Sequence, residues 1–267
     1  MTRTQTITLL SLVIALSAVG TVHSADVPDV QTIVNKTNIV AYYQADDGKA
    51  KVKMTITDKR GQKRNREFII LRQDVADGGD QNYFVYFQKP SDVRRMTYMV
   101  HKHAAMDKDD DRWLYMPALD VVNRIAAGDK RTSFVGSDFL YEDVSGRSLD
   151  EDTHELIETT DTAFIVKNVP KKPDSVEFSY YTVVIDRANY VPTKMEFFDK
   201  TGKLYRTIES KEVKTIQGFP TVTKSVVQDL KTGSKTEMEF SGVKYDLKLK
   251  NVFQERYLRR PPREAMR

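Results

Sequence analysis

Alternating apolar and polar side chains are the main pattern of the chain beyond residue 48. In the segment 51–57, Val52, Met54 and Ile56 fall on one face and polar side chains fall on the other. This period of two predicts a half-buried β-strand. Similar alternation, or a short run rich in β-branched and aromatic residues, predicts further strands over 66–72, 83–88, 94–103, 112–116, 155–159, 164–168, 177–186, 193–198, 204–215, 221–228 and 236–249.

Turns that end in glycine separate several of these segments, over 58–61, 199–202 and 230–233. In each turn the glycine occupies the position where a type I turn followed by a bulge needs a left-handed residue. Such turns predict an antiparallel meander rather than strand–helix–strand units. Within the last predicted strand the apolar phase slips at Ser241 and Gly242, which predicts a β-bulge that bends the sheet.

One segment, 28–44, has a clear helical period. Val30, Ile33 and Val34 fall on a single apolar stripe, which continues to Val40. This spacing predicts an amphipathic helix, and Pro28 is suited to its first turn.

Two predicted strands are apolar on both faces, at 83–87 and 178–185. A strand that is buried on both sides needs a cover on each side, yet the sequence offers little helix beyond 28–44. We therefore predict a mainly β protein with a strongly curved antiparallel sheet. The N-terminal helix and a loop or short-helix segment would cover its concave face. A sheet of this shape favours an apolar cavity at its mouth.

The start of the chain has the features of a secretory signal peptide, over residues 1–24. Arg3 precedes an almost wholly apolar run over 7–19, shorter than the roughly 20 residues of a membrane-spanning helix, and small residues follow. We place cleavage after Ser24 and expect export to a bacterial periplasm. An uncleaved anchor is the alternative interpretation.

Composition narrows the class of protein further. The chain has 267 residues, a formal net charge of +4, 40% apolar residues and no cysteine. The apolar content argues against disorder, and the small charge imbalance argues against nucleic-acid binding. The lack of cysteine excludes disulfides, thiol catalysis and thiolate metal sites. We expect one domain over 25–258, followed by a loose tail over 259–267.

Sequence motifs of catalysis are missing. The chain has no G-x-S-x-G, no H-E-x-x-H and no phosphate-binding G-x-x-x-x-G-K. His101 and His103 share one face of a predicted strand, but two imidazoles without a third ligand do not make a zinc site. Aspartates within 107–111 have calcium-loop spacing, but Arg112 stands where glycine is required. We expect no enzymatic activity, no metal and no cofactor.

The segment 113–146 contains the only tryptophan, is punctuated by proline and glycine, and offers only short pieces for regular structure. Its aromatic residues are Trp113, Tyr115, Phe134, Phe139 and Tyr141. One interpretation is a loop that pins itself to the sheet. The other is a cover over a ligand cavity, because long connections of this kind are commonly functional.

The same segment carries a recognisable motif. It consists of WLYMP at 113–117, RI at 124–125, SFVGSDF at 133–139 and YED at 141–143, extended by PTKMEFFD at 192–199 and GKL at 202–204. Together these residues resemble the outer-membrane lipoprotein-sorting protein family, a LolA/LolB-like group. The resemblance covers nearly all of the chain after the signal peptide. The chain departs from it in its extra length, in the added middle motif and in lacking the lipid-anchor cysteine of the receptor.

The resemblance implies an unclosed β-barrel of roughly ten or eleven strands, with helices plugging its open side. It also implies a periplasmic carrier that holds acyl chains in an apolar cavity. Related proteins often accompany exporters of the resistance-nodulation-division type, which extends the expected cargo to other lipids. Arg124 lies within the motif and is the place to look for the arginine that locks the lid of such carriers.

The sequence thus predicts a carrier that takes the acyl chains of a lipoprotein or lipid and passes them towards the outer membrane or an exporter. The expected partners are the acylated cargo, the exporter and, transiently, a membrane. The residues expected at the cavity or in its lid are Trp113, Tyr115, Met116, Arg124, Phe134, Phe139 and Tyr141. The alternative hypothesis is a periplasmic adaptor of an exporter that binds no lipid.

Overall fold

A computed structural model describes residues 27–76, 78–105 and 107–266. The expected signal peptide, residues 1–24, lies outside the described residues. The strands are β1 (Asp47–Thr57), β2 (Lys63–Asp74), β3 (Gln81–Lys89), β4 (Thr97–Lys102), β5 (Asp111–Met116), β6 (Val121–Arg124), β7 (Asp152–Thr159), β8 (Ala163–Pro170), β9 (Phe178–Asp186), β10 (Pro192–Asp199), β11 (Leu204–Ile216), β12 (Phe219–Asp229) and β13 (Ser234–Tyr245).

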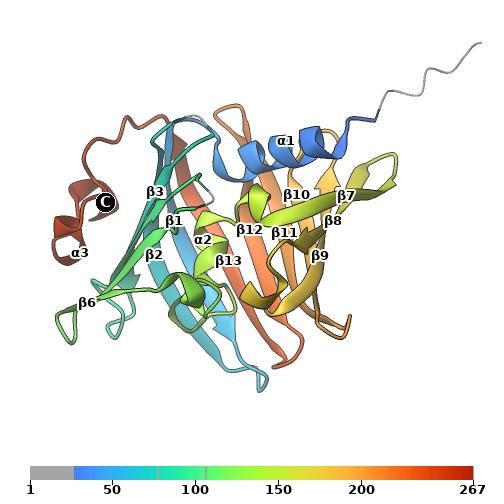
Figure 1. Cartoon of the computed structure of the whole chain (residues 1–267). Helices are drawn as coiled ribbons and strands as arrows, with labels where there is room; N and C mark the ends of the chain where they lie inside the picture. Colours follow the sequence, from blue (N-terminus) through green and yellow to red (C-terminus); the bar gives the residue numbers. More distant parts are fainter. Residues whose placement is uncertain (1–26, 77, 106, 267) are drawn as a thin grey trace, which may run out of the picture.

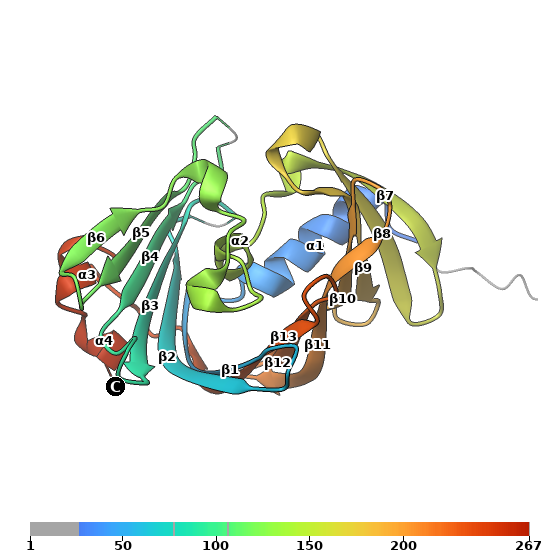
Figure 2. The same ribbon diagram turned by 90° about the horizontal axis from the view of Figure 1, so that it is seen from below.

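All of these strands belong to one 13-stranded antiparallel sheet, in the order β6-β5-β4-β3-β2-β1-β13-β12-β11-β10-β9-β8-β7. The sheet curls into a half-barrel that is not closed, with β6 and β7 at its two edges (Figures 1 and 2). The predicted fold class is therefore confirmed. The sheet has more strands than the family resemblance implied. The strand-by-strand prediction missed only β6, a four-residue edge strand too short to show a period.

Glycine residues at the turns fix the register of the antiparallel strands. Gly61, Gly202 and Gly233 have φ values of 79°, 79° and 75°, the left-handed conformation that glycine adopts without steric cost. The predicted bulge is confirmed as well, because the pairing of β1 with β13 shifts register between Lys49 and Lys51, opposite Gly242 with φ 56°.

The predicted helix is α1 (Val30–Tyr42), which begins two residues after Pro28 because Asp29 is its N-cap. The Asp29 carboxylate accepts a hydrogen bond from the Thr32 backbone N–H at 2.9 Å, as an N-cap residue does. Ile33 and Val34 are buried against the concave face of β8–β11. At its other end, Arg72 of β2 donates to the carbonyls of residues 42, 44 and 45. The helix thus bridges the two halves of the sheet.

A second element, residues 125–146, covers the concave face of β1–β5 and is called the cover segment here. It contains the 3-10 turns η1 (Ala127–Asp129) and η2 (Phe134–Gly136) and the short helix α2 (Tyr141–Ser145). Two further turns follow, η3 (Leu149–Glu151) and η4 (Pro173–Ser175). In Figure 2, α1 and α2 lie side by side inside the curve of the sheet.

The convex face of β2–β5 is covered by residues 247–266, the C-terminal segment, with α3 (Arg256–Arg259) and α4 (Arg263–Met266) (Figure 2). Leu258 and Ala265 are buried there, at 1% and 0% exposure, in one cluster with residues of β2–β5. The expectation of a loose tail over 259–267 is therefore wrong for residues 260–266, because Ala265 is buried against the sheet. This segment is also the outer cover that the two-faced strand at 83–87 requires.

Among the described residues, no helix combines the length and the apolar character needed to cross a membrane.

Candidate functional site

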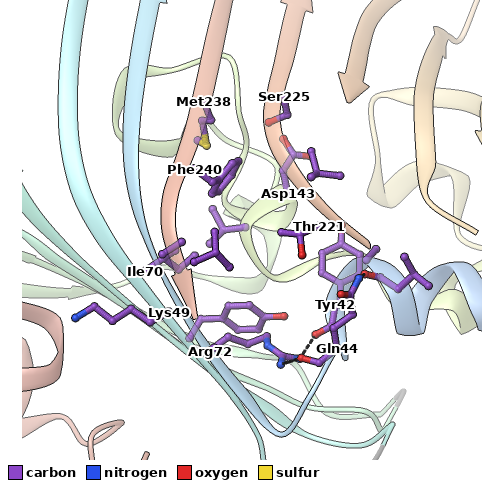
Figure 3. A pocket seen from close by; sticks show the side chains of 18 of the residues that line it. Tyr42, Gln44, Lys49, Ile70, Arg72, Asp143, Thr221, Ser225, Met238 and Phe240 are labelled. Carbon is purple, nitrogen blue, oxygen red and sulfur yellow. Dashed lines mark hydrogen bonds between the residues drawn. The ribbon is translucent and has the colours of Figure 1, made fainter. Parts of the chain in front are cut away.

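An apolar cavity of about 330 Å³ lies between α1, the cover segment and the floor of the half-barrel. Figure 3 shows side chains of β12, β13 and the end of α1 converging on it. Its apolar lining comes from Val40, Ala41, Ala50, Phe68, Ile70, Val85, Phe134, Phe139, Val144, Val222, Met238, Phe240 and Val243. A concave site lined in this way is suited to hydrocarbon.

The polar groups at this cavity are largely engaged with the protein itself. Gln44 Nε2 donates to the Pro220 carbonyl at 2.7 Å, and the Thr221 and Tyr245 hydroxyls are hydrogen-bonded at 2.8 Å. These groups therefore shape the rim of the cavity, and they are not arranged as a nucleophile with a base.

Two of the expected site residues line the cavity. Phe134 and Phe139 of the cover segment form part of its roof. Phe134 is 0% exposed, and its ring lies 5.5–6.2 Å from those of four aromatic residues, Phe68, Phe87, Tyr98 and Tyr141. Tyr141 packs behind Phe134 and contributes to the core. The interpretation of this part of the segment as a cover fits its placement.

The other expected site residues lie elsewhere. Trp113 and Tyr115 belong to the cluster on the convex face, under the C-terminal segment. Alternation along β5 points these odd-numbered side chains away from the cavity, so the expectation of a lid role does not match their placement. Met116 is half-buried at the end of β5. Arg124 is 69% exposed and pairs with Asp111 at the sheet edge.

The structure brings a different set of charged residues to the cover segment. Glu142 of α2 is 3% exposed and is surrounded by three cations. Its carboxylate lies 3.1 Å from Lys130 Nζ and 3.2 Å from an Arg147 guanidinium nitrogen, and it also accepts a hydrogen bond from Arg131. Burial alone would raise the pKa of Glu142, but Arg131, Lys130 and Arg147 lower it to about 2.

The same network ties the cover segment to the second half of the sheet. Arg131 forms a two-pronged pair with Glu177 at 2.6 and 2.7 Å, just before β9. Asp143 accepts from Arg206 of β11. These contacts of the cover segment are called the ionic latch here. The local sequence did not predict the contacts with Glu177 and Arg206, because these two residues lie 46 and 63 positions from their partners.

A strained residue sits at the centre of the cover segment. Val135 has φ 49°, a left-handed conformation that costs a non-glycine residue about 1–3 kcal/mol and is unusual for a β-branched side chain. Packing of Phe134 on one side and hydrogen bonds of Ser137 to Phe134 and Phe139 carbonyls on the other hold it there. The backbone conformation of the cover segment at Val135 is therefore held by packing and hydrogen bonds rather than by the intrinsic preference of valine.

The histidines that the sequence singled out have local partners. His103 lies between Asp80 and Asp111, at 2.9 and 3.4 Å, and His101 Nε2 is 3.0 Å from the Phe253 carbonyl. Within 27–76, 78–105 and 107–266, no group of three or more His, Asp or Glu side chains has the arrangement of a metal site.

The architecture is thus that of an unclosed β-barrel with an apolar cavity beneath helical plugs. A family model described as "uncharacterized protein-like" matches residues 79–260, more than half of the chain, and the chain belongs to that family. No curated protein matches the sequence.

Solved structures carry the comparison further. A DUF1329 family protein from Desulfovibrio piger is 26% identical, with a TM-score of 0.78 over 86% of this chain and 98% of that one. A Vibrio parahaemolyticus protein described as an outer membrane lipoprotein-sorting domain is 25% identical, with a TM-score of 0.77 and the same coverage. The resemblance to lipoprotein-sorting proteins is therefore confirmed.

A LolA superfamily protein from Nitrosomonas europaea has the same fold, at 17% identity and a TM-score of 0.67 over 86% of this chain and all of that one.

Proposed function

We propose that the protein is a periplasmic carrier that holds the acyl chains of a lipoprotein or lipid in the cavity beneath the cover segment. The observation that carries this proposal is the apolar cavity of about 330 Å³, roofed by Phe134 and Phe139. The family likeness supports the same role. The carrier would pass its cargo towards the outer membrane or to an exporter of the resistance-nodulation-division type.

Binding of a long chain requires the cover segment to move or the cavity to widen. Withdrawing one deeply buried phenyl side chain costs about 3–5 kcal/mol, and each buried methylene contributes about 0.8 kcal/mol. About five buried methylenes therefore offset the cost of withdrawing one phenylalanine ring. A chain of about sixteen carbons offsets the cost of withdrawing both Phe134 and Phe139. Release needs no fuel, because an acceptor with higher affinity draws the cargo away.

Filling the cavity should abolish acyl binding. Ser225 of β12 faces the cavity opposite Met238, so the Ser225→Phe variant places a ring where hydrocarbon would lie. We expect it to bind a palmitoylated peptide at least about tenfold more weakly than wild type, measured by titration calorimetry. The same peptide without its acyl chain serves as the baseline.

The adjacent residue provides a matched control. Val226 follows Ser225 on β12 but faces the opposite side of the sheet, so Val226→Phe should leave binding unchanged. Equal affinity for the acylated and unacylated peptides in wild type would contradict the carrier and favour the lipid-free adaptor. Equal weakening by both variants would show that the cavity is not the binding site.

A further inference from the structure

A second, polar pocket of about 210 Å³ lies at the open side of the half-barrel. Residues 103–105 and 108–110 before β5 and residues 171, 172 and 175 before β9 form two of its walls, and these segments face each other across the opening in Figure 2. The cover segment forms its floor. Any cargo entering between the two edges of the sheet would meet this pocket.

Positive charge dominates the pocket. Its lining includes seven basic and four acidic side chains, a net charge of +3. The acids Glu142, of the ionic latch, and Glu151, of η3, are both paired with Lys130 and Arg147. Asp110 pairs with Arg112 at 2.5 Å, and Asp109 lines the pocket beside Lys108.

Three exposed lysines stand at the mouth of this pocket: Lys108 on one wall and Lys171 and Lys172 on the other. They are the groups that an incoming anion would meet first.

Two of the basic side chains are buried. Arg112 is 2% exposed; its Nη2 lies 2.5 Å from Asp110, while its Nε has no hydrogen-bond partner among the described residues. Lys102 is 6% exposed and donates to the Ser145 carbonyl at 2.9 Å. A buried guanidinium with an unused N–H is costly unless a ligand or water completes it, and here it borders the pocket.

A third space of about 150 Å³ borders both the polar pocket and the apolar cavity. This space shares Gly146 and Arg147 with the polar pocket and Tyr42 and Phe139 with the apolar cavity. A Cβ on Gly146 would lie 2.6 Å from the Tyr42 ring, so only glycine allows the ring to pack so closely at this junction. A single molecule with a charged end and an apolar chain would occupy both sites if the Tyr42 ring moved off Gly146.

We propose that the polar pocket binds the phosphate group of a lipid cargo whose acyl chain lies in the apolar cavity. This inference rests on the proposed carrier function and names the headgroup chemistry that the carrier selects. Clustered Lys and Arg with an unused guanidinium N–H match a phosphate, which offers several acceptor oxygens and up to two negative charges. A neutral headgroup would bring no negative charge to the exposed lysines at the mouth, Lys108, Lys171 and Lys172.

The test compares two ligands that share one acyl chain. Wild-type protein is titrated calorimetrically with palmitoyl lysophosphatidic acid and with monopalmitoylglycerol, below their micellar concentrations. We expect the phosphate-bearing lipid to bind at least about fivefold more tightly. The double variant Lys171→Gln/Lys172→Gln should lose most of that preference while keeping its affinity for monopalmitoylglycerol.

A charge-matched control is Lys59→Gln/Lys63→Gln, which removes the same charge from the exposed β1–β2 hairpin. It should retain the preference, and equal loss in both double variants would overturn the site in favour of net charge. Equal wild-type affinity for both lipids would overturn the headgroup site alone. Binding of neither lipid would overturn the carrier function together with it.

A competition experiment with inorganic phosphate distinguishes a lipid headgroup from free phosphate as the natural ligand. Competition with the phosphate-bearing lipid at millimolar concentrations supports the headgroup site. Phosphate binding as tight as that of the lipid would show that free phosphate is the ligand and would overturn the proposal.

Discussion

Replacing Phe134 with alanine should lower the free energy of unfolding by about 3–5 kcal/mol, the range for a fully buried phenylalanine. The ring is 0% exposed and contacts four other aromatic rings between the sheet and α2. Its loss leaves a cavity and also removes the packing that holds Val135 in its left-handed conformation. Chemical denaturation followed by circular dichroism measures the change.

The same variant should load acyl ligand faster, because the cover segment loses its main apolar attachment. Leu119→Ala is the control, since Leu119 is 67% exposed and its truncation should change stability by no more than about 0.5 kcal/mol. A Phe134→Ala protein as stable as this control would show that the cover segment is not anchored through the aromatic cluster.

Glu142→Gln should have the second large effect, a loss of about 3 kcal/mol of stability at neutral pH. Removing the carboxylate leaves Lys130, Arg131 and Arg147 as partly buried cations around a neutral amide, and breaking a buried ion pair in this way costs about 3–5 kcal/mol. Thermal or denaturant unfolding at pH 7 measures the loss. Glu155→Gln, at an exposed position of β7, is the matched control and should be near neutral.

The pH dependence of stability gives an independent check on Glu142. Because the pKa of Glu142 falls from 4.5 to about 2 in the folded protein, its contribution is fully present above pH 4.5 and is lost as pH falls towards 2. Wild type should therefore lose about 3 kcal/mol from this group over that window, and Glu142→Gln should lose correspondingly less. Parallel curves for the two proteins would contradict the role of the ionic latch.

Local sequence patterns were sufficient to predict the strands of the sheet, but not the C-terminal segment that covers its convex face. Alternation in segments such as 51–57 and glycine at turn positions such as 61 depend on neighbours in sequence, so both are visible without a structure. The helices of the C-terminal segment are four residues each, too short to show a period. Their attachment depends on a groove made by distant strands, which the local sequence does not reveal.

The candidate site was predictable only in part, for a related reason. The aromatic richness of 113–146 correctly indicated buried contacts, but it did not say which face of the sheet each residue covers. Trp113 and Tyr115 pack on the convex face, whereas Phe134 and Phe139 line the cavity. The pair of Asp143 with Arg206 joins residues 63 positions apart, and such charge partners are brought together by the tertiary fold rather than by sequence spacing.

Native mass spectrometry of the protein purified directly from the cells that produce it, followed by organic extraction of its contents, tests the carrier function most directly. We predict a mass that exceeds that of the polypeptide by one acyl lipid or lipoprotein, and an extract that contains phosphate-bearing lipid. A bare polypeptide mass, unchanged after incubation with lipids and lipopeptides, would contradict the carrier function.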